Sequence, residues 1–186
     1  MADKINIEEM ATFCKKKGIV FSNSEIYGGM SGFFDYGPLG VELKNNIKQD
    51  WWKTFVQNRS DVVGIDGAII SHPRVWEASG HVANFSDVYV KCKACKKPNK
   101  IDKNELESAK CDCGGEYDVI GDVNLMFKTN VGPVDGNAAY LRPETAQLIF
   151  TNFRTVSDTS RVKLPFGIAQ IGRAFRNEIS PRDFLF

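Results

Sequence analysis

Four cysteines lie close together in the middle of the chain. Cys92 and Cys95 are separated by two residues, Cys111 and Cys113 by one, and a pair of glycines follows. Thiolates in two close pairs are a common ligand set for tetrahedral zinc. The first spacing is that of a zinc knuckle, whereas the second is one residue shorter than usual. The pattern therefore predicts a structural zinc ion with four thiolate ligands, or a degenerate zinc ribbon that has lost its metal.

Arg176 and Glu178 lie in a second polar group, where an apolar stretch ends in Phe-Arg-Asn-Glu and is followed by the polar residues Arg182 and Asp183. The planar guanidinium of Arg176 can bind a phosphate through two parallel hydrogen bonds. An Arg and a Glu two residues apart on a strand are more often a solvated ion pair. From these residues alone, phosphate binding and a surface ion pair both remain open.

A third carboxylate, Glu144, follows Pro143 at the expected start of a helix. Proline is favoured at the first helical position, and an acid in the first turn complements the helix dipole. Glu144 is therefore either a binding residue or a helix-stabilising acid. The helix is predicted to carry Ala146, Ile149, Phe150 and Phe153.

Two further helices are expected near the N-terminus. Asn6 and Glu9 fit a capping box that opens a helix of about three turns, ending near Gly18. From Val41 onwards a long amphipathic helix is predicted, whose buried face carries an apolar residue at every fourth position: Leu43, Ile47, Trp51 and Phe55. Between them, the segment 27–40 mixes glycines with aromatic residues, which favours an ordered loop whose aromatics are buried or in contact with something.

Alternating or β-branched segments predict the strands. These segments are 62–70, FSDVYVKC before the cysteines, YDVIGDVNLMFKT after them, and 165–180. The cysteine-rich block then becomes an insert within one catalytic-type domain. The predicted organisation is 1–90, an insert over 91–116, and continuation of the first domain over 117–186.

Composition places the chain among globular proteins: 186 residues, 42% hydrophobic, with a formal net charge of +1. This balance gives no general electrostatic attraction to nucleic acid. No apolar run approaches the roughly 20 residues that span a bilayer. The odd number of cysteines argues against a secreted disulfide framework, so a cytoplasmic location is predicted and Cys14 is expected to be a buried small hydrophobe.

The Phe-Arg-Asn-Glu stretch resembles motif 2 of class II aminoacyl-tRNA synthetases. Four longer stretches are similar to glycyl-tRNA synthetases in particular: GFFDYGPLGVELKNN, VWEASGH, LRPETAQ and GRAFRNEISPRDFLF. They occur in this order and span Gly32 to Phe186. Their order and number make the match specific, whereas the four-residue stretch alone would be weak.

The resemblance implies an α+β fold, with an antiparallel sheet flanked by helices and a small cysteine-rich insert. It implies ATP- and Mg²⁺-dependent activation of glycine to glycyl-adenylate, followed by transfer to the 3′ end of tRNA(Gly). Arg176 and Glu178 match the catalytic, ATP-binding residues, and Arg182 falls in the ATP-contacting loop. Glu144 matches the acid that faces the glycine ammonium, with Arg142 and Gln147 in the same pocket. His81 and His72 are expected to be structural.

The helix after Gly40 resembles motif 1, which implies a homodimer. The resemblance also implies a third motif, with a second ATP-binding arginine, and an anticodon-binding domain outside these residues, so the 186 residues alone are expected to be inactive.

Two alternatives from other classes remain. One is a non-catalytic synthetase-like scaffold, such as a polymerase accessory subunit, against which the presence of Arg176, Glu178 and Glu144 argues. The other is a zinc-ribbon nucleic-acid module, for which six lysines supply charge: Lys91, Lys93, Lys96, Lys97, Lys100 and Lys103.

Overall fold

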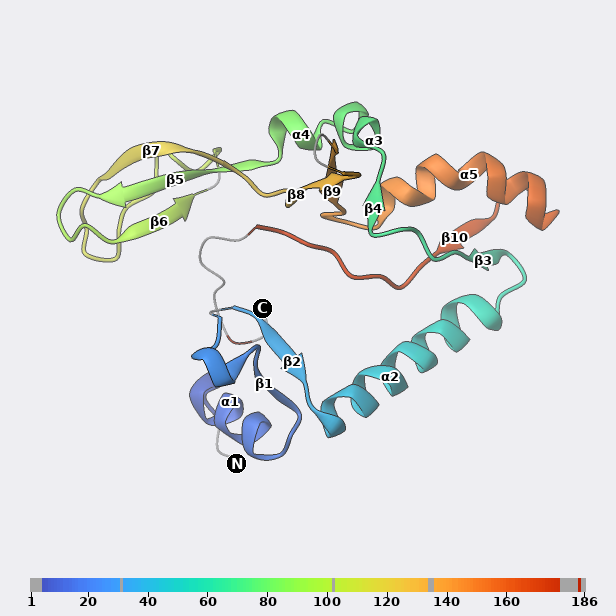
Figure 1. The fold of residues 1–186 in the computed structure, drawn as a ribbon, viewed down its shortest axis with the longest axis horizontal. Helices are drawn as coiled ribbons and strands as arrows, with labels where there is room; N and C mark the ends of the chain where they lie inside the picture. The colour runs from blue at the N-terminus through green and yellow to red at the C-terminus, as the bar shows by residue number, and fades with distance from the viewer. Residues whose placement is uncertain (1–4, 31, 102, 134–135, 178–183, 185–186) are drawn as a thin grey trace. The chain divides into compact units, whose positions relative to one another are not determined.

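The computed structural model describes residues 5–30, 32–101, 103–133, 136–177 and 184. The chain divides into two compact units, Met1–Ser60 with Ser180–Phe186, and Asp61–Ile179 (Figure 1). Within the described ranges, no helix is both long and apolar enough to span a bilayer.

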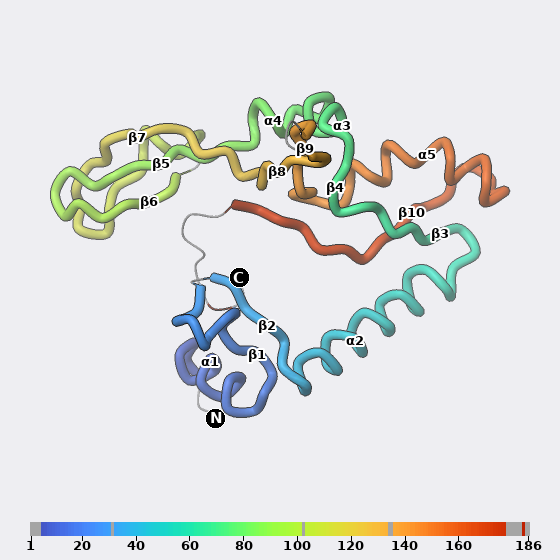
Figure 2. The backbone as a smooth tube through the Cα atoms, viewed as in Figure 1, coloured from blue at the N-terminus to red at the C-terminus, as the bar shows by residue number. Residues whose placement is uncertain are grey.

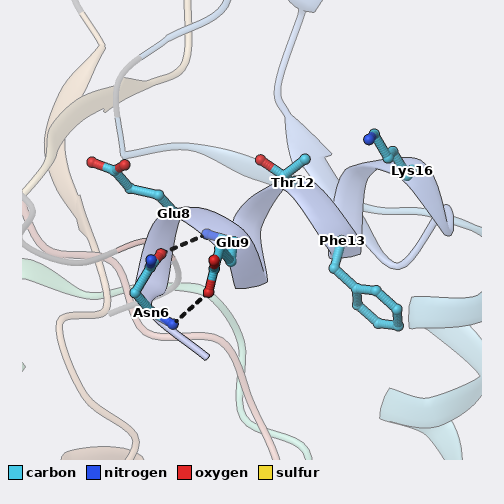
Figure 3. A pocket seen from close by; sticks show the side chains of 6 residues that line it. All are labelled: Asn6, Glu8, Glu9, Thr12, Phe13 and Lys16. Atoms are coloured by element: carbon cyan, nitrogen blue, oxygen red, sulfur yellow. Dashed lines mark hydrogen bonds between the residues drawn. The ribbon is translucent and has the colours of Figure 1, made fainter. Parts of the chain in front are cut away.

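The first unit opens with helix α1, Ile7–Lys16, which confirms the predicted capping box. The Glu9 amide donates to Asn6 Oδ1 at 2.8 Å, and the Asn6 amide donates to Glu9 Oε2 at 3.1 Å. Figure 3 shows both bonds beside a surface pocket that is also lined by Thr12, Phe13 and Lys16. Cys14 is buried, as expected, on the inner side of this helix.

Strand β1, Val20–Ser22, follows α1 and pairs antiparallel with β2, Phe34–Tyr36. A short 3₁₀ turn, Glu25–Tyr27, lies between them. The segment predicted as an ordered loop thus includes a strand. Its aromatics are less enclosed than predicted, because a two-stranded ribbon offers little surface to cover them: the Tyr27 side chain is 86% exposed.

Helix α2, Pro38–Trp52, continues into a π-helical turn, η2, over Lys53–Gln57. The helix confirms the sequence pattern, but its apolar stripe is not buried as predicted. The stripe residues are 38 to 62% exposed: Leu39, Leu43, Ile47, Trp51 and Phe55. Only the start of α2 is closely packed, where a Cβ on Gly40 would lie 1.8 Å from the Ile19 carbonyl oxygen. The rest of the apolar face has no covering element among the described residues of its own unit.

The second unit contains three small sheets (Figure 1). Strands β4 (Ile70–Ser71), β9 (Asn137–Leu141) and β8 (Lys128–Val131) form one antiparallel sheet, and β6 (Pro98–Ile101), β5 (Ser86–Cys92) and β7 (Tyr117–Asn124) form another. Strand β3, Val62–Gly64, pairs in parallel with β10, Gly167–Ala169, two segments far apart in sequence (Figure 2). The helices are α3 (Pro73–Ala78), α4 (His81–Asn84) and α5 (Ala146–Ser160).

The fold is mixed α and β with antiparallel sheets, as the resemblance implied, but the β3–β10 pair is parallel. The strand predicted over 165–180 is also shorter than expected. β10 has three residues, and the only later ladder contact described is a bridge between Met126 and Arg176. Between β10 and this bridge, the main chain makes isolated hydrogen bonds instead of a ladder. In one of them, the Phe175 amide donates to the Arg142 carbonyl at 2.9 Å.

Helix α5 begins later than predicted. Its N-cap is Thr145, so Pro143 and Glu144 precede the helix rather than forming its first turn. The Pro143 side chain is fully buried. Glu144 therefore directly precedes the N-cap and does not lie in the first turn, where the helix-dipole interpretation had placed it.

The β5–β6–β7 sheet carries the cysteine-rich segment on a small apolar core of its own. Val88, Val90 and Ile101 are buried in it, and Leu106 and Tyr117 pack against them. This core fixes the end of β5, where the first cysteine lies.

Candidate functional site: a cysteine cluster and an arginine–carboxylate pocket

The four cysteine sulfurs converge, although their pairs are far apart in sequence. All four lie within 4.8 Å of one another. Cys92 Sγ is 3.5 Å from Cys113 Sγ, and Cys95 Sγ is 3.5 Å from Cys111 Sγ. Zinc–sulfur bonds of about 2.3 Å in a tetrahedron separate the sulfurs by about 3.8 Å. The donor set and its spacing therefore fit a tetrahedral thiophilic ion.

Two turns aim these sulfurs at one point. Lys96, at φ 60°, turns the chain after Cys95. In the second pair, the Cys111 amide donates to the Gly115 carbonyl at 3.0 Å, and Gly114 adopts φ 78°. The left-handed glycine reverses the chain within a very short span. It thereby accommodates the Cys-x-Cys spacing that is one residue shorter than a usual knuckle.

Main-chain amides favour thiolate at two of these sulfurs. Donation from the Cys95 amide is the main cause that lowers the pKa of Cys92 to about 6, and the Cys113 amide lowers the pKa of Cys111. At Cys95 the amide of Lys97 also lowers the pKa, but burial and the neighbouring sulfurs outweigh it and raise the pKa to about 12. Ionisation of one cysteine thus disfavours ionisation of its neighbours. A bound cation would offset the repulsion between the thiolate charges.

Acidic neighbours face several of the lysines around the cluster. Lys93 Nζ lies 2.9 Å from Glu116 Oε2, and Lys103 Nζ lies 2.7 Å from Asp122 Oδ2. Lys100 likewise pairs with Asp87 at 2.6 Å. These pairs neutralise much of the charge that the nucleic-acid module would need.

Glu144 is the centre of the second group of polar residues. Its Oε1 accepts a hydrogen bond from Gln147 Nε2 at 2.6 Å and lies 3.3 Å from His81 Nε2. Ser79 Oγ is 2.8 Å from the other imidazole nitrogen, Nδ1. The Glu144 side chain is still 35% exposed. Two of the predicted glycine-site residues, Glu144 and Gln147, are therefore in direct contact, and the carboxylate remains accessible.

Arg176 lies beside this carboxylate-bearing segment. Its Nε donates to the Pro143 carbonyl at 3.4 Å, and its guanidinium lies over the Phe85 ring, 5.2 Å from the ring centroid. The predicted phosphate-binding arginine thus contacts the residue that precedes the predicted ammonium-binding acid, although 31 residues lie between Glu144 and Arg176 in sequence. Glu178 and Arg182 lie outside the described residues.

Arg142 has a structural role that the sequence did not predict. It is 3% exposed, its Nε donates to the Arg173 carbonyl at 2.7 Å, and its Nη1 donates to the Gly67 carbonyl at 2.5 Å. A Cβ on Gly172 would lie 2.2 Å from Nη2, so only glycine leaves room for the guanidinium there. Arg142 joins two chain segments, and Nη2 has no hydrogen-bond partner among the described residues.

Sequence reasoning missed the contacts of Gln170, and it expected His81, which lies 3.3 Å from Glu144, to be structural. Gln170 Nε2 donates to the Thr145 carbonyl at 2.5 Å and its Oε1 accepts from the Gly67 amide at 3.2 Å. No spacing pattern in the sequence predicts such hydrogen bonds between a side chain and the main chain of a distant segment. The neighbourhood of His81 in VWEASGH was the one available signal, because that stretch belongs to the resemblance.

The second group of polar residues thus consists of the Glu144 carboxylate, with Gln147 and His81 in contact with it, and of Arg176 on the carbonyl of the preceding residue, Pro143. No family model matches the chain.

The chain is similar to glycine–tRNA ligases. That of Treponema denticola is 53% identical over 98% of this chain, and that of Borreliella burgdorferi strain ZS7 is 51% identical over 98%. That of Treponema pallidum strain Nichols is 49% identical over 97%. The chain covers 40 to 42% of the length of these relatives. It is therefore a homologue of glycine–tRNA ligases that spans about two fifths of their length, which confirms the resemblance to glycyl-tRNA synthetases.

Proposed function

We propose that this chain is the amino-acid-activating part of a cytoplasmic glycine–tRNA ligase. The ligase joins glycine to ATP with Mg²⁺, releases pyrophosphate, and transfers glycine to the 3′ end of tRNA(Gly). The observation that carries the proposal is the approach of Arg176 to the segment bearing Glu144, with Arg176 Nε 3.4 Å from the Pro143 carbonyl. The sequence identity of 51 to 53% to glycine–tRNA ligases supports glycine as the amino acid.

In the first step, a glycine carboxylate oxygen attacks the α-phosphorus of ATP, and the bond from that phosphorus to pyrophosphate breaks. Such a reaction depends on positioning and on stabilising the charge that develops. Arg176 holds the α-phosphate, and Glu178 and Arg182 complete the ATP contacts. Mg²⁺ supplies further charge neutralisation at the phosphates.

Glycine is held at its two charged ends. Glu144 receives the ammonium group, Gln147 steadies that carboxylate, and Arg142 offers Nη2 to the glycine carboxylate. Attractive contacts alone distinguish weakly between glycine and alanine, which differ by one methyl group. The glycine site must therefore be small enough to exclude alanine sterically. The pinned guanidinium of Arg142 forms one rigid wall of such a pocket.

Pyrophosphate exchange tests the proposal. Labelled pyrophosphate should enter ATP when the full-length protein is given glycine, and far more slowly with alanine or serine. The absence of exchange with glycine would favour the non-catalytic scaffold instead, and exchange that requires no amino acid would show that the reaction is not glycine activation.

The cysteine cluster holds one structural Zn²⁺ through Cys92, Cys95, Cys111 and Cys113. The convergence of the four sulfurs within 4.8 Å supports this. With four protein ligands no coordination position is left for water, so the ion shapes the β5–β6–β7 segment and takes no part in the reaction.

Gly115→Ala should weaken the zinc site. A Cβ there would lie 2.8 Å from Cys92 Sγ and 3.0 Å from Ala94 Cβ, and such overpacking costs about 1 to 3 kcal/mol. Elemental analysis of protein purified without chelator should give close to one zinc per wild-type chain and less in the variant, with faster loss to a chelator.

Gly121→Ala is the matched control, because a Cβ at that position meets nothing within 4 Å. It should retain zinc like the wild type. A wild-type zinc content near zero, with five titratable thiols in the native protein, would remove the zinc assignment.

The exposed stripe of α2 forms a homodimer interface. Its five large apolar residues lie on one helix, and an uncovered apolar patch of this kind marks an association site. Ile47→Asp, which places a charge in the middle of the stripe, should shift the full-length protein from dimer to monomer in sedimentation velocity. Gln49→Asp, at an exposed polar position of the same helix, should leave the dimer intact.

A further inference from the structure

We infer that His81 is a positioning residue for glycine: it fixes the Glu144 carboxylate so that the oxygen not already engaged faces the substrate ammonium. This inference rests on the proposed function. It assigns a role in amino-acid binding to a histidine that the sequence suggested was merely structural.

Both described contacts of the Glu144 carboxylate fall on one oxygen. Gln147 Nε2 lies 2.6 Å from Oε1 and His81 Nε2 lies 3.3 Å from the same atom. Within the described ranges, Oε2 has no protein partner. Two groups that approach one carboxylate oxygen from different elements, α5 and α4, fix the plane of the carboxylate and leave Oε2 for a ligand.

The imidazole is itself held on three sides. The Trp76 ring meets it edge-on at 5.5 Å between centroids, and the Phe85 ring lies 5.2 Å away. Ser79 Oγ lies 2.8 Å from Nδ1. The His81 side chain is only 12% exposed, so little rotational freedom remains.

The Glu144 contact decides which imidazole nitrogen carries the proton, because an ionised carboxylate oxygen can only accept a hydrogen bond. In neutral imidazole one nitrogen donates and the other accepts. When the Ser79 hydroxyl donates to Nδ1, the proton must reside on Nε2, the nitrogen that faces the carboxylate. A bare Nε2 would set its lone pair against the carboxylate oxygen. Ser79 Oγ, which also lies 3.3 Å from the Trp76 carbonyl, is then the group that faces Nδ1 on the other side of the ring.

The test compares two His81 variants in full-length protein by glycine-dependent pyrophosphate exchange. His81→Phe keeps an aromatic ring between Trp76 and Phe85 but removes the N–H. It should raise the KM for glycine about tenfold, the loss of one charge-assisted contact, and leave the KM for ATP within about twofold. His81→Gln restores an N–H near the position of Nε2 and should recover most of the glycine affinity.

Ser79→Ala is the second probe, because it frees Nδ1 without touching the ring packing. A glycine KM raised severalfold supports the inference even if His81→Phe fails to fold. An unchanged glycine KM in folded His81→Phe or in Ser79→Ala would overturn it, as would a loss confined to kcat and thermal stability in both His81 variants. Wild-type protein that shows no glycine-dependent exchange refutes the proposed function itself, and the positioning role falls with it.

Discussion

Glu144→Gln in the full-length protein is expected to raise the KM for glycine about 30-fold or more. The substitution preserves size and removes the charge that pairs with the substrate ammonium. A charge-assisted hydrogen bond lost in a partly enclosed pocket costs about 2 kcal/mol, which corresponds to that factor. Because Glu144 precedes α5 rather than lying in its first turn, helix stability should change little.

The measurement is the glycine dependence of pyrophosphate exchange, at saturating ATP, with thermal melting to confirm folding. Glu116→Gln provides the control, since Glu116 is an exposed acid paired with Lys93 beside the cysteine cluster. That variant should keep the wild-type glycine dependence. Glu144→Gln protein that folds and binds glycine unchanged would show that LRPETAQ is not the amino-acid pocket.

Arg142→Met is expected to destabilise the protein by about 3 kcal/mol or more. Methionine fills similar space, but the Gly67 and Arg173 carbonyls lose their donors in a buried setting, and an unsatisfied buried group costs about 1 to 3 kcal/mol. In a thermal melt the midpoint should fall by about 6 °C or more. Glycine binding should weaken as well, because the pocket loses a rigid wall.

Gln147→Met is the matched control for stability, because the Gln147 side chain bonds only to the partly exposed Glu144 among the described residues. It should change the midpoint by little. If Arg142→Met melted like Gln147→Met and lost only glycine affinity, Arg142 would be purely a ligand-binding residue, and its two carbonyl contacts would carry no stability.

Local patterns predicted the local features well. Short-range sequence signals predicted the capping box of α1, the strands on both sides of the cysteines and the burial of Cys14. They also predicted the long helix, from Val41 onwards, which begins three residues earlier at Pro38. The cysteine spacing predicted a cluster, and the sulfurs do meet. These signals suffice because each depends on residues close together in sequence.

Features set by distant contacts were not predictable in the same way. The 165–180 strand is interrupted because Gln170 and the carbonyl of Arg173 bond to side chains and loops from 67 to 145, and no periodicity encodes those partners. The contact between His81 and Glu144 joins the VWEASGH and LRPETAQ stretches, and nothing in the sequence indicates that these two stretches meet. The α2 stripe predicted burial, yet the described residues of its own unit supply nothing to cover it.

The most direct test of the central claim is charging of tRNA(Gly) by the full-length protein with labelled amino acids. The account predicts ATP-dependent transfer of labelled glycine to the 3′ end, no comparable transfer of alanine, and a loss of about 100-fold or more in Arg176→Ala, in line with the removal of a preorganised charge that stabilises a transition state. Charging with alanine at a comparable rate, or wild-type activity in Arg176→Ala, would contradict the assignment of this site to glycine activation.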